Sequence, residues 1–195
     1  MPKKLTLKEE SPRYGLNRFE ESSRDRSEEE FVRHEKELLI NEDIAFYSSI
    51  GELLEGIGFE KTIVTREGDT NIRFDATLCG YPAIPIEIKS PRETMYVNMK
   101  SIRQALENKV VLLSRNFYPT TKEAPSLAIG FEIPNERSDV EELIRDIKEV
   151  FDINIGVIDV ATLLRLYFKV TINGESHHKQ LLINLRGIYE EVENS

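Results

Sequence analysis

The chain has 195 residues, enough for one sizeable domain and too few for two independent ones. Its net charge of -9 argues against unaided tight binding to nucleic acid, because such affinity comes mainly from Lys and Arg on phosphates. The single cysteine excludes an internal disulfide and a cysteine zinc cluster. No apolar run reaches the roughly 18 residues of a membrane span, and the first residues lack the apolar core of a signal peptide. We therefore expect a cytoplasmic protein that does not contact a membrane.

Residues 1–27 are polar, mixed in charge and poor in aliphatic side chains, which predicts a charged and possibly flexible N-terminal arm. Residues 28–195 are expected to form a single domain. The segment Ser27-Glu-Glu-Glu30 resembles a capping box and predicts the start of one or two helices that continue to about Gly56. Helical projection places eight apolar residues in one stripe: Leu39, Ile40, Phe46, Tyr47, Ile50, Leu53, Leu54 and Ile57.

An acidic residue, Asp43, lies in the middle of this stripe. An acid among apolar side chains is costly unless it has a partner, so Asp43 is a candidate for a site that the helix shares with a sheet. Glu42 at the edge of the stripe is the second candidate, whereas Glu52 and His34 project to the solvated side. Alternatively, Asp43 caps a second helix after a break near Asn41.

A strand is predicted at 61–66, followed by a β-hairpin with arms at 71–78 and 84–89. Both arms alternate with a period of two, so apolar residues fall on one face and Asp75, Glu87 and Lys89 on the other. If the hairpin is symmetric about Tyr81, Asp75 lies across from Glu87, with Cβ atoms roughly 5 Å apart. Two carboxylates and an ammonium group are therefore expected to converge.

Close carboxylates repel each other, and a bound cation would remove that cost. Hard oxygen ligands suit Mg²⁺, which usually takes one or two protein carboxylates and keeps several waters. With Lys89 to orient water or neutralise phosphate charge, the arrangement indicates phosphodiester hydrolysis. The alternative is that these residues form the solvated face of an ordinary amphipathic hairpin.

At these residues the chain resembles the PD-(D/E)xK nuclease superfamily. Phe74-Asp75 stands where the family often has Pro-Asp, and Glu87-Ile88-Lys89 matches its acid-x-Lys triplet. A helix from about Val97 to Asn108 and an apolar strand Val110–Leu113 complete an order of elements similar to the family's αβββαβ core. The resemblance implies a restriction-endonuclease-like α/β fold, with a mixed central sheet flanked by helices.

The whole chain further resembles the small catalytic subunit of heterodimeric type IIS restriction endonucleases. The resemblance implies a DNA endonuclease with Mg²⁺ on Asp75 and Glu87, Lys89 as a catalytic residue, and a larger partner subunit that recognises double-stranded DNA and nicks one strand. In the family an acid from the first helix often joins the site, which favours Asp43. A Gln of the matching helix does so in several relatives, which suggests Gln104, although a solvated position is the alternative.

Two other functions compete with this one: a self-sufficient structure-specific or repair nuclease, and a nuclease-like binding module. The presence of Asp75, Glu87 and Lys89 argues against the binding module, which would not need catalytic residues. The acidic balance, with only residues 61–122 net positive, and the absence of a recognisable DNA-reading motif favour the subunit.

The C-terminal part predicts further strands and helices. They are a strand at Leu127–Phe131, a helix at Asp139–Phe151, a strand at Ile153–Ile158, a helix at Ala161–Val170, a turn at Asn173-Gly174 and a helix at Gln180–Val192. Adjacent residues point apart and no third ligand is evident, so His177 and His178 are expected in a solvated turn rather than on a metal.

Overall fold

The computed structural model describes residues 28–41, 43–64, 75–115, 118–175 and 177–190. The strands are β1 (Lys61–Val64), β2 (Ala76–Cys79), β3 (Ile84–Lys89), β4 (Ser126–Gly130), β5 (Ile155–Asp159) and β6 (Gly187–Tyr189). The helices are one over residues 28–40, α2 (Asp43–Gly56), α3 (Met99–Arg115), α4 (Arg137–Phe151), α5 (Val160–Asn173) and α6 (His178–Ile183).

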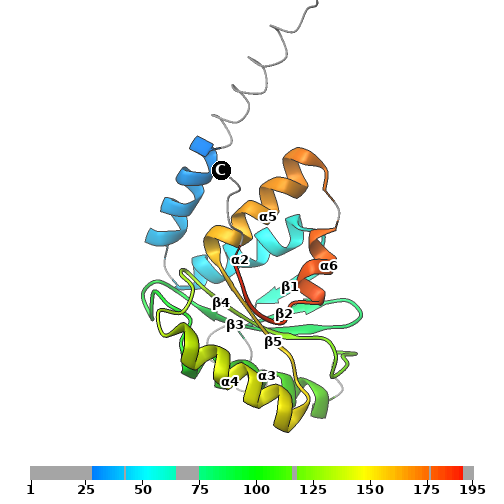
Figure 1. Cartoon of the computed structure of the whole chain (residues 1–195). Helices are drawn as coiled ribbons and strands as arrows, with labels where there is room; N and C mark the ends of the chain where they lie inside the picture. The colour runs from blue at the N-terminus through cyan, green and yellow to red at the C-terminus, as the bar shows by residue number, and fades with distance from the viewer. Residues whose placement is uncertain (1–27, 42, 65–74, 116–117, 176, 191–195) are drawn as a thin grey trace, which may run out of the picture.

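The six strands form one sheet in the order β1-β2-β3-β4-β5-β6. The pairs β1-β2 and β2-β3 are antiparallel, whereas β3 to β6 run parallel. Helices α2, α5 and α6 lie on one face of this sheet, and α3 and α4 lie on the other (Figure 1). The predicted α/β class, a mixed central sheet flanked by helices, is confirmed.

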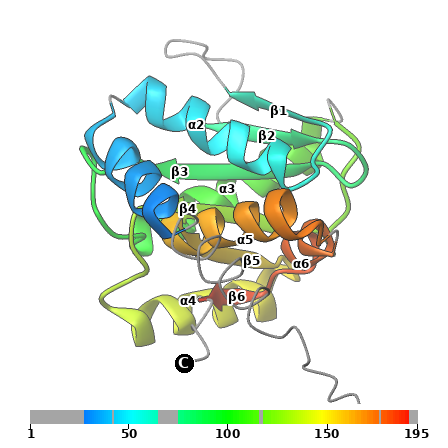
Figure 2. The same ribbon diagram turned by 90° about the horizontal axis from the view of Figure 1, so that it is seen from above.

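Separate apolar cores fill the two sides of the sheet. The first joins α2 and α5 to the isoleucines of β3 and includes Phe46, Ile50 and Leu54. The second joins α3 and α4 to β4 and β5. Viewed from above, α2 and α5 lie side by side across the sheet (Figure 2). Strand β3 is thus covered on both faces, and its alternate residues Pro85, Glu87 and Lys89 point to the side of α3.

The β2-β3 hairpin has the register expected from its symmetry about Tyr81. Ala76 pairs with Ile86, Thr77 with Pro85 and Leu78 with Ile84. Gly80 in the turn has a φ of 133°, which a residue with a side chain rarely adopts. The predicted strand residues 65–66 and 71–74 lie outside the described residues, as do the expected arm 1–27, the capping Ser27 and Glu42.

The predicted strand Val110–Leu113 is wrong, because α3 continues through it to Arg115. A four-residue apolar run does not distinguish a strand from a buried turn of helix. The helical signal was the spacing of Ile102, Ala105, Lys109 and Leu112, all of which are buried, while Val110 is exposed. The αβββαβ order is nevertheless present, with β4 as its last strand.

The predicted helix at Gln180–Val192 is correct only over residues 180–183. Helix α6 ends at Ile183, and Gly187, with a φ of 76°, begins the short strand β6, which pairs in parallel with β5. A helix cannot continue through a residue with this φ. No helix in the described part of the chain is long and apolar enough to cross a membrane.

The predicted apolar stripe is interrupted where the first helix ends. The helix over residues 28–40 stops before Asn41, and α2 begins at Asp43 with a different rotation. Leu38 is therefore buried, whereas the predicted core residues Leu39 and Ile40 are exposed. From Phe46 onward the stripe is correct.

Two isoleucines of the predicted stripe offer a direct test of this packing. Ile50 is fully buried and Ile40 is 75% exposed. We expect Ile50→Ala to lower the free energy of unfolding by about 2–5 kcal/mol, because it leaves a cavity. The change Ile40→Ala should cost no more than about 0.5 kcal/mol. Urea unfolding followed by circular dichroism measures both, and equal losses would contradict the break between the two helices.

Candidate active site

The end of β3 holds a buried carboxylate beside a partly buried ammonium group. Glu87 is 3% exposed, and Lys89, two residues further along the same face of the strand, places its Nζ 2.9 Å from Glu87 Oε1. Because β3 is an inner strand with helices on both faces, neither side chain has free access to water. The structure therefore brings together two of the residues that the hairpin pattern predicted.

Helix α3 supplies the second partner of Glu87. Asn108 is buried, and its Nδ2 donates a hydrogen bond of 3.0 Å to Glu87 Oε2. Both carboxylate oxygens are thus occupied, by Lys89 on one side and Asn108 on the other. Sequence reasoning missed Asn108, although a polar residue on the apolar face of a helix is a signal that can be found.

Asp75, the residue that precedes β2, lies next to this pair. The register Ala76↔Ile86, extended by one residue, sets Asp75 across from Glu87, as predicted. Its Oδ2 accepts a 2.7 Å hydrogen bond from the Ile88 amide. Burial and the charge of Glu87 raise the pKa of Asp75 to about 7, against the smaller opposing effects of the Ile88 amide and Lys89.

The charge of Lys89 is stabilised by its surroundings. Burial disfavours the ammonium form, but the carboxylates of Glu87, Glu93 and Asp75 outweigh burial and raise the pKa of Lys89. Its Nζ also lies 3.7 Å from Glu93 Oε1. Glu93 comes from the turn after β3 and was not predicted as part of the site.

Helix α2 reaches the same place from the opposite face of the sheet. Ser90 Oγ donates a short hydrogen bond to Asp43 Oδ1, and Tyr47 Oη donates to Glu93 Oε2 at 3.0 Å. Burial and the charges of Asp75, Glu93 and Asp43 raise the pKa of Tyr47, which keeps its hydroxyl protonated. Asp43 is the first residue of the second helix, and its carboxylate contacts the residue after Lys89.

Gln104 lies one helical turn before Asn108 on the face of α3 that packs on the sheet. Its Oε1 is buried and has no hydrogen-bond partner among the described residues. An unpartnered buried oxygen is uncommon and suits a site that binds a ligand. Lys100, Arg92 and Arg103 are exposed.

This arrangement suits a divalent cation and a phosphate. Asp75 and Glu87 offer hard oxygen donors whose mutual repulsion a cation would relieve, and Gln104 adds an unused carbonyl oxygen nearby. Lys89 supplies a fixed positive charge at the same strand end. Metal-assisted phosphodiester hydrolysis needs carboxylates that bind a cation and a positive charge that faces the phosphate. Asp75, Glu87 and Lys89 offer both.

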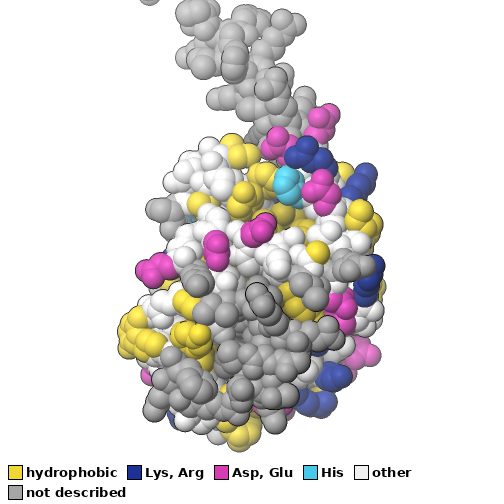
Figure 3. Space-filling model, turned by 180° about the vertical axis from the view of Figure 1, so that it is seen from behind, with side chains coloured by type: hydrophobic (Ala, Val, Ile, Leu, Met, Phe, Trp, Pro, Cys, Tyr) yellow, Lys and Arg dark blue, Asp and Glu magenta, His cyan; other side chains and the backbone are white. Residues whose placement is uncertain are grey.

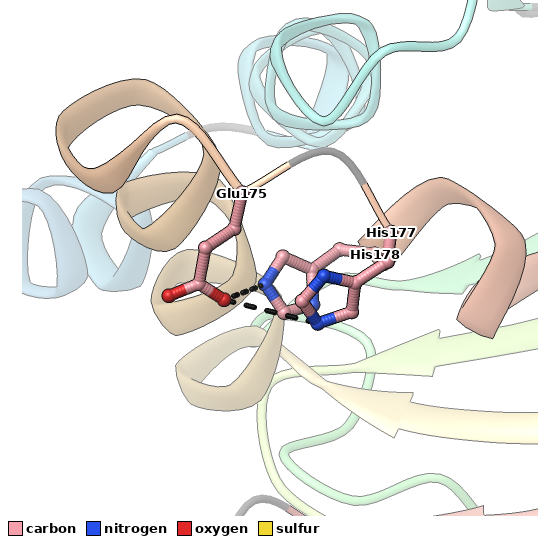
Figure 4. Close-up of side chains that lie close together, drawn as sticks. All are labelled: Glu175, His177 and His178. Carbon is pink, nitrogen blue, oxygen red and sulfur yellow. Dashed lines mark hydrogen bonds and ion pairs between the residues drawn. The ribbon is translucent and has the colours of Figure 1, made fainter.

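The expectation for His177 and His178 is wrong in part. His177 is exposed, but His178 is buried, and Glu175 is the third potential ligand that the sequence did not reveal. The two rings point toward the Glu175 carboxylate (Figure 4). This cluster lies at the junction of α5 and α6, apart from the end of β3.

The raised pKa of Asp75 predicts a pH-dependent stability in metal-free buffer. The folded state holds this proton up to about pH 7 and the unfolded chain loses it near 3.8, so the contribution of Asp75 is complete below pH 3.8 and lost as the pH rises through 7. Asp75→Asn should remove that loss between pH 5 and 8 in urea unfolding with EDTA. The exposed control Asp146→Asn should follow the wild type, and parallel curves for all three proteins would contradict the shift.

No family model and no curated protein sequence matches the chain. Among solved structures, the chain is similar to the restriction endonuclease FokI bound to DNA, with a TM-score of 0.49 and 12% sequence identity. The match covers 84% of this chain and 34% of the FokI chain, so the protein spans about a third of the length of that structure.

Proposed function

We propose that this chain is a Mg²⁺-dependent DNA endonuclease whose active centre is formed by Asp75, Glu87 and Lys89. The observation that carries the proposal is the convergence of these three side chains at the end of β3, where burial and the charge of Glu87 raise the pKa of Asp75. The first part of the motif lies on one arm of a hairpin and the triplet on the other, as in the nuclease superfamily that the sequence resembles.

Asp75 and Glu87 would hold the metal, which when bound lowers the pKa of a coordinated water and stabilises charge on the phosphate. Lys89 would keep an ammonium group beside the phosphate oxygens or orient the attacking water. Asn108 would position Glu87 by holding its Oε2, and Asp43 would position the turn after Lys89 through Ser90. Gln104, with its free Oε1, remains a candidate for contact with substrate or metal-bound water.

We further propose that the chain acts as the cleavage subunit of a heterodimeric type IIS restriction enzyme, in which a larger subunit reads the DNA. The net charge is -9, and in the described part of the face that Figure 3 shows, acidic side chains are spread over the upper part while basic ones lie mainly along one edge. Weak attraction to phosphates is expected from such a surface. A partner that holds this chain over one strand would replace the missing affinity by a high effective concentration.

The self-sufficient nuclease is the second candidate, because the proposed catalytic residues are all on this chain. It predicts activity without a second protein, whereas the subunit predicts activity only in a complex. Both candidates use the same catalytic centre. Substitutions in that centre therefore test the cleavage reaction, and activity with and without a second protein distinguishes the two candidates.

The first test concerns the carboxylates. Asp75→Asn and Glu87→Gln should each reduce Mg²⁺-dependent nicking of supercoiled DNA by at least about 100-fold, because each removes a charged ligand at nearly constant shape. Lys89→Ala should impair cleavage comparably while Mg²⁺ binding is largely retained. Glu52→Gln, an exposed acid of α2, is the matched control and should keep full activity. Normal cleavage by either carboxylate variant would exclude the proposed centre.

The second test concerns the partner. The purified chain should show little site-specific cleavage alone, and should gain it when mixed with a larger DNA-binding protein encoded beside its gene. If that partner cuts the other strand, wild-type complexes should give double-strand breaks, and Glu87→Gln complexes should give nicks only. Site-specific double-strand cleavage by the chain alone at nanomolar concentration would instead establish the self-sufficient nuclease.

A further inference from the structure

A second group of ligand atoms lies where α5 ends and α6 begins. Gly174, with a φ of 71°, terminates α5 and lets the chain reverse, so that Glu175 faces the start of α6. His177 is the residue before α6, and His178 is its first residue. Three side chains from one short junction thereby come together, with no contribution from the residues of the proposed catalytic centre.

The three side chains place their potential ligand atoms close to one another. His178 Nε2 lies 2.8 Å from Glu175 Oε2, and His177 Nε2 lies 3.8 Å from the same oxygen. The ring centroids of the histidines are 4.2 Å apart, and one ligand atom from each of the three residues lies within 4.8 Å of the others. Figure 4 shows both rings directed at the carboxylate rather than apart.

These distances fit the ligand shell of a small divalent ion. Zinc binds imidazole nitrogen and carboxylate oxygen at about 2.0–2.2 Å, so tetrahedral ligand atoms lie roughly 3.4 Å from each other. The observed separations of 2.8 and 3.8 Å fall on either side of that value. Small rotations of the partly exposed Glu175 side chain and of the exposed His177 ring would bring both to it. Two histidines and one carboxylate leave the fourth position to water.

The burial of His178 is the second, independent observation. This residue is 4% exposed, yet its Nδ1 has no hydrogen-bond partner in the part of the chain that the structure describes. The contact with Glu175 uses Nε2, so this nitrogen is the one that faces the cluster. Burial also fixes the ring before any ion binds, which lowers the entropic cost of binding.

The ammonium group of Lys179, the residue after His178, lies over the ring of Phe59, with its Nζ 5.5 Å from the ring centroid. Imidazole ligands favour zinc and its neighbours in the first transition row over Mg²⁺, which prefers oxygen. The cluster therefore differs in ligand chemistry from Asp75 and Glu87.

We propose that Glu175, His177 and His178 bind a divalent transition metal ion, with zinc as the best match to the ligand set. The ion joins the end of α5 to the start of α6 and stabilises that junction. It is a structural site, separate from the proposed catalytic centre, because α2 runs between the two regions and its 14 residues span about 20 Å.

Titration of the full chain with Co²⁺ tests this proposal, because Co²⁺ in a tetrahedral nitrogen and oxygen site absorbs visible light and Zn²⁺ displaces it. We expect one equivalent to bind with an absorption band that Zn²⁺ removes, and Zn²⁺ to raise the melting temperature. The variants His177→Ala and Glu175→Gln should each weaken binding at least tenfold and abolish the thermal shift. His177 is 70% exposed in its side chain, so its loss should not unfold the protein.

The controls separate this site from adventitious binding and from the catalytic centre. The chain has three histidines, and His34→Ala removes the one that lies elsewhere, beside the Phe168 ring, so it should leave Co²⁺ binding unchanged. The double variant Asp75→Asn, Glu87→Gln should also retain the band. The proposal is overturned if no band appears, if His34→Ala weakens binding as much as His177→Ala, or if the band depends on the carboxylates at β3.

Discussion

The placement of Glu87 inside the sheet is the constraint on which the rest of this region depends. An acid on an inner strand, covered by helices on both faces, must have partners for its charge, and it has two, Lys89 and Asn108. Lys89 follows from the period of the strand alone. Asn108 lies at the end of the helix that the sequence predicted, and the continuation of α3 to Arg115 places it well inside the helix that covers this face of the sheet.

Asp75 is the residue whose charge is least well compensated in this arrangement. Glu87 has its two partners, whereas Asp75 has the Ile88 amide and a repulsive neighbour, and its pKa rises to about 7. A folded protein gains nothing in stability from such a pair, and sites of this kind are where function is maintained at the expense of stability. Helix α2 fixes the turn after β3 from the other face of the sheet. It does so through two hydrogen bonds, between Asp43 and Ser90 and between Tyr47 and Glu93.

The hairpin was predictable residue by residue because two independent signals agreed: alternation with a period of two and a turn centred on Tyr81. Together they specify which residue faces which. Where only one signal was present, prediction failed. The apolar run at 110–113 fits a strand or a helix, and Ile40 fits the stripe only if the helix does not break at Asn41. Asn108, Glu93 and Glu175 were missed for a different reason, since their partners are distant in sequence or lie across a chain reversal.

Helix α2 contacts elements that belong to each of the two proposed sites. Its N-terminal turn contacts the end of β3, and its C-terminal end packs so closely on α5 that a Cβ at Gly56 would lie 2.3 Å from the Tyr167 ring. Movement of α5 would therefore be transmitted to α2, because this contact leaves no room for sliding. An ion at the α5-α6 junction would restrain α5 at its far end and, through α2, restrain the residues that support Lys89. Its expected effect on DNA cleavage is thus indirect, through the stability of the support rather than through the chemistry.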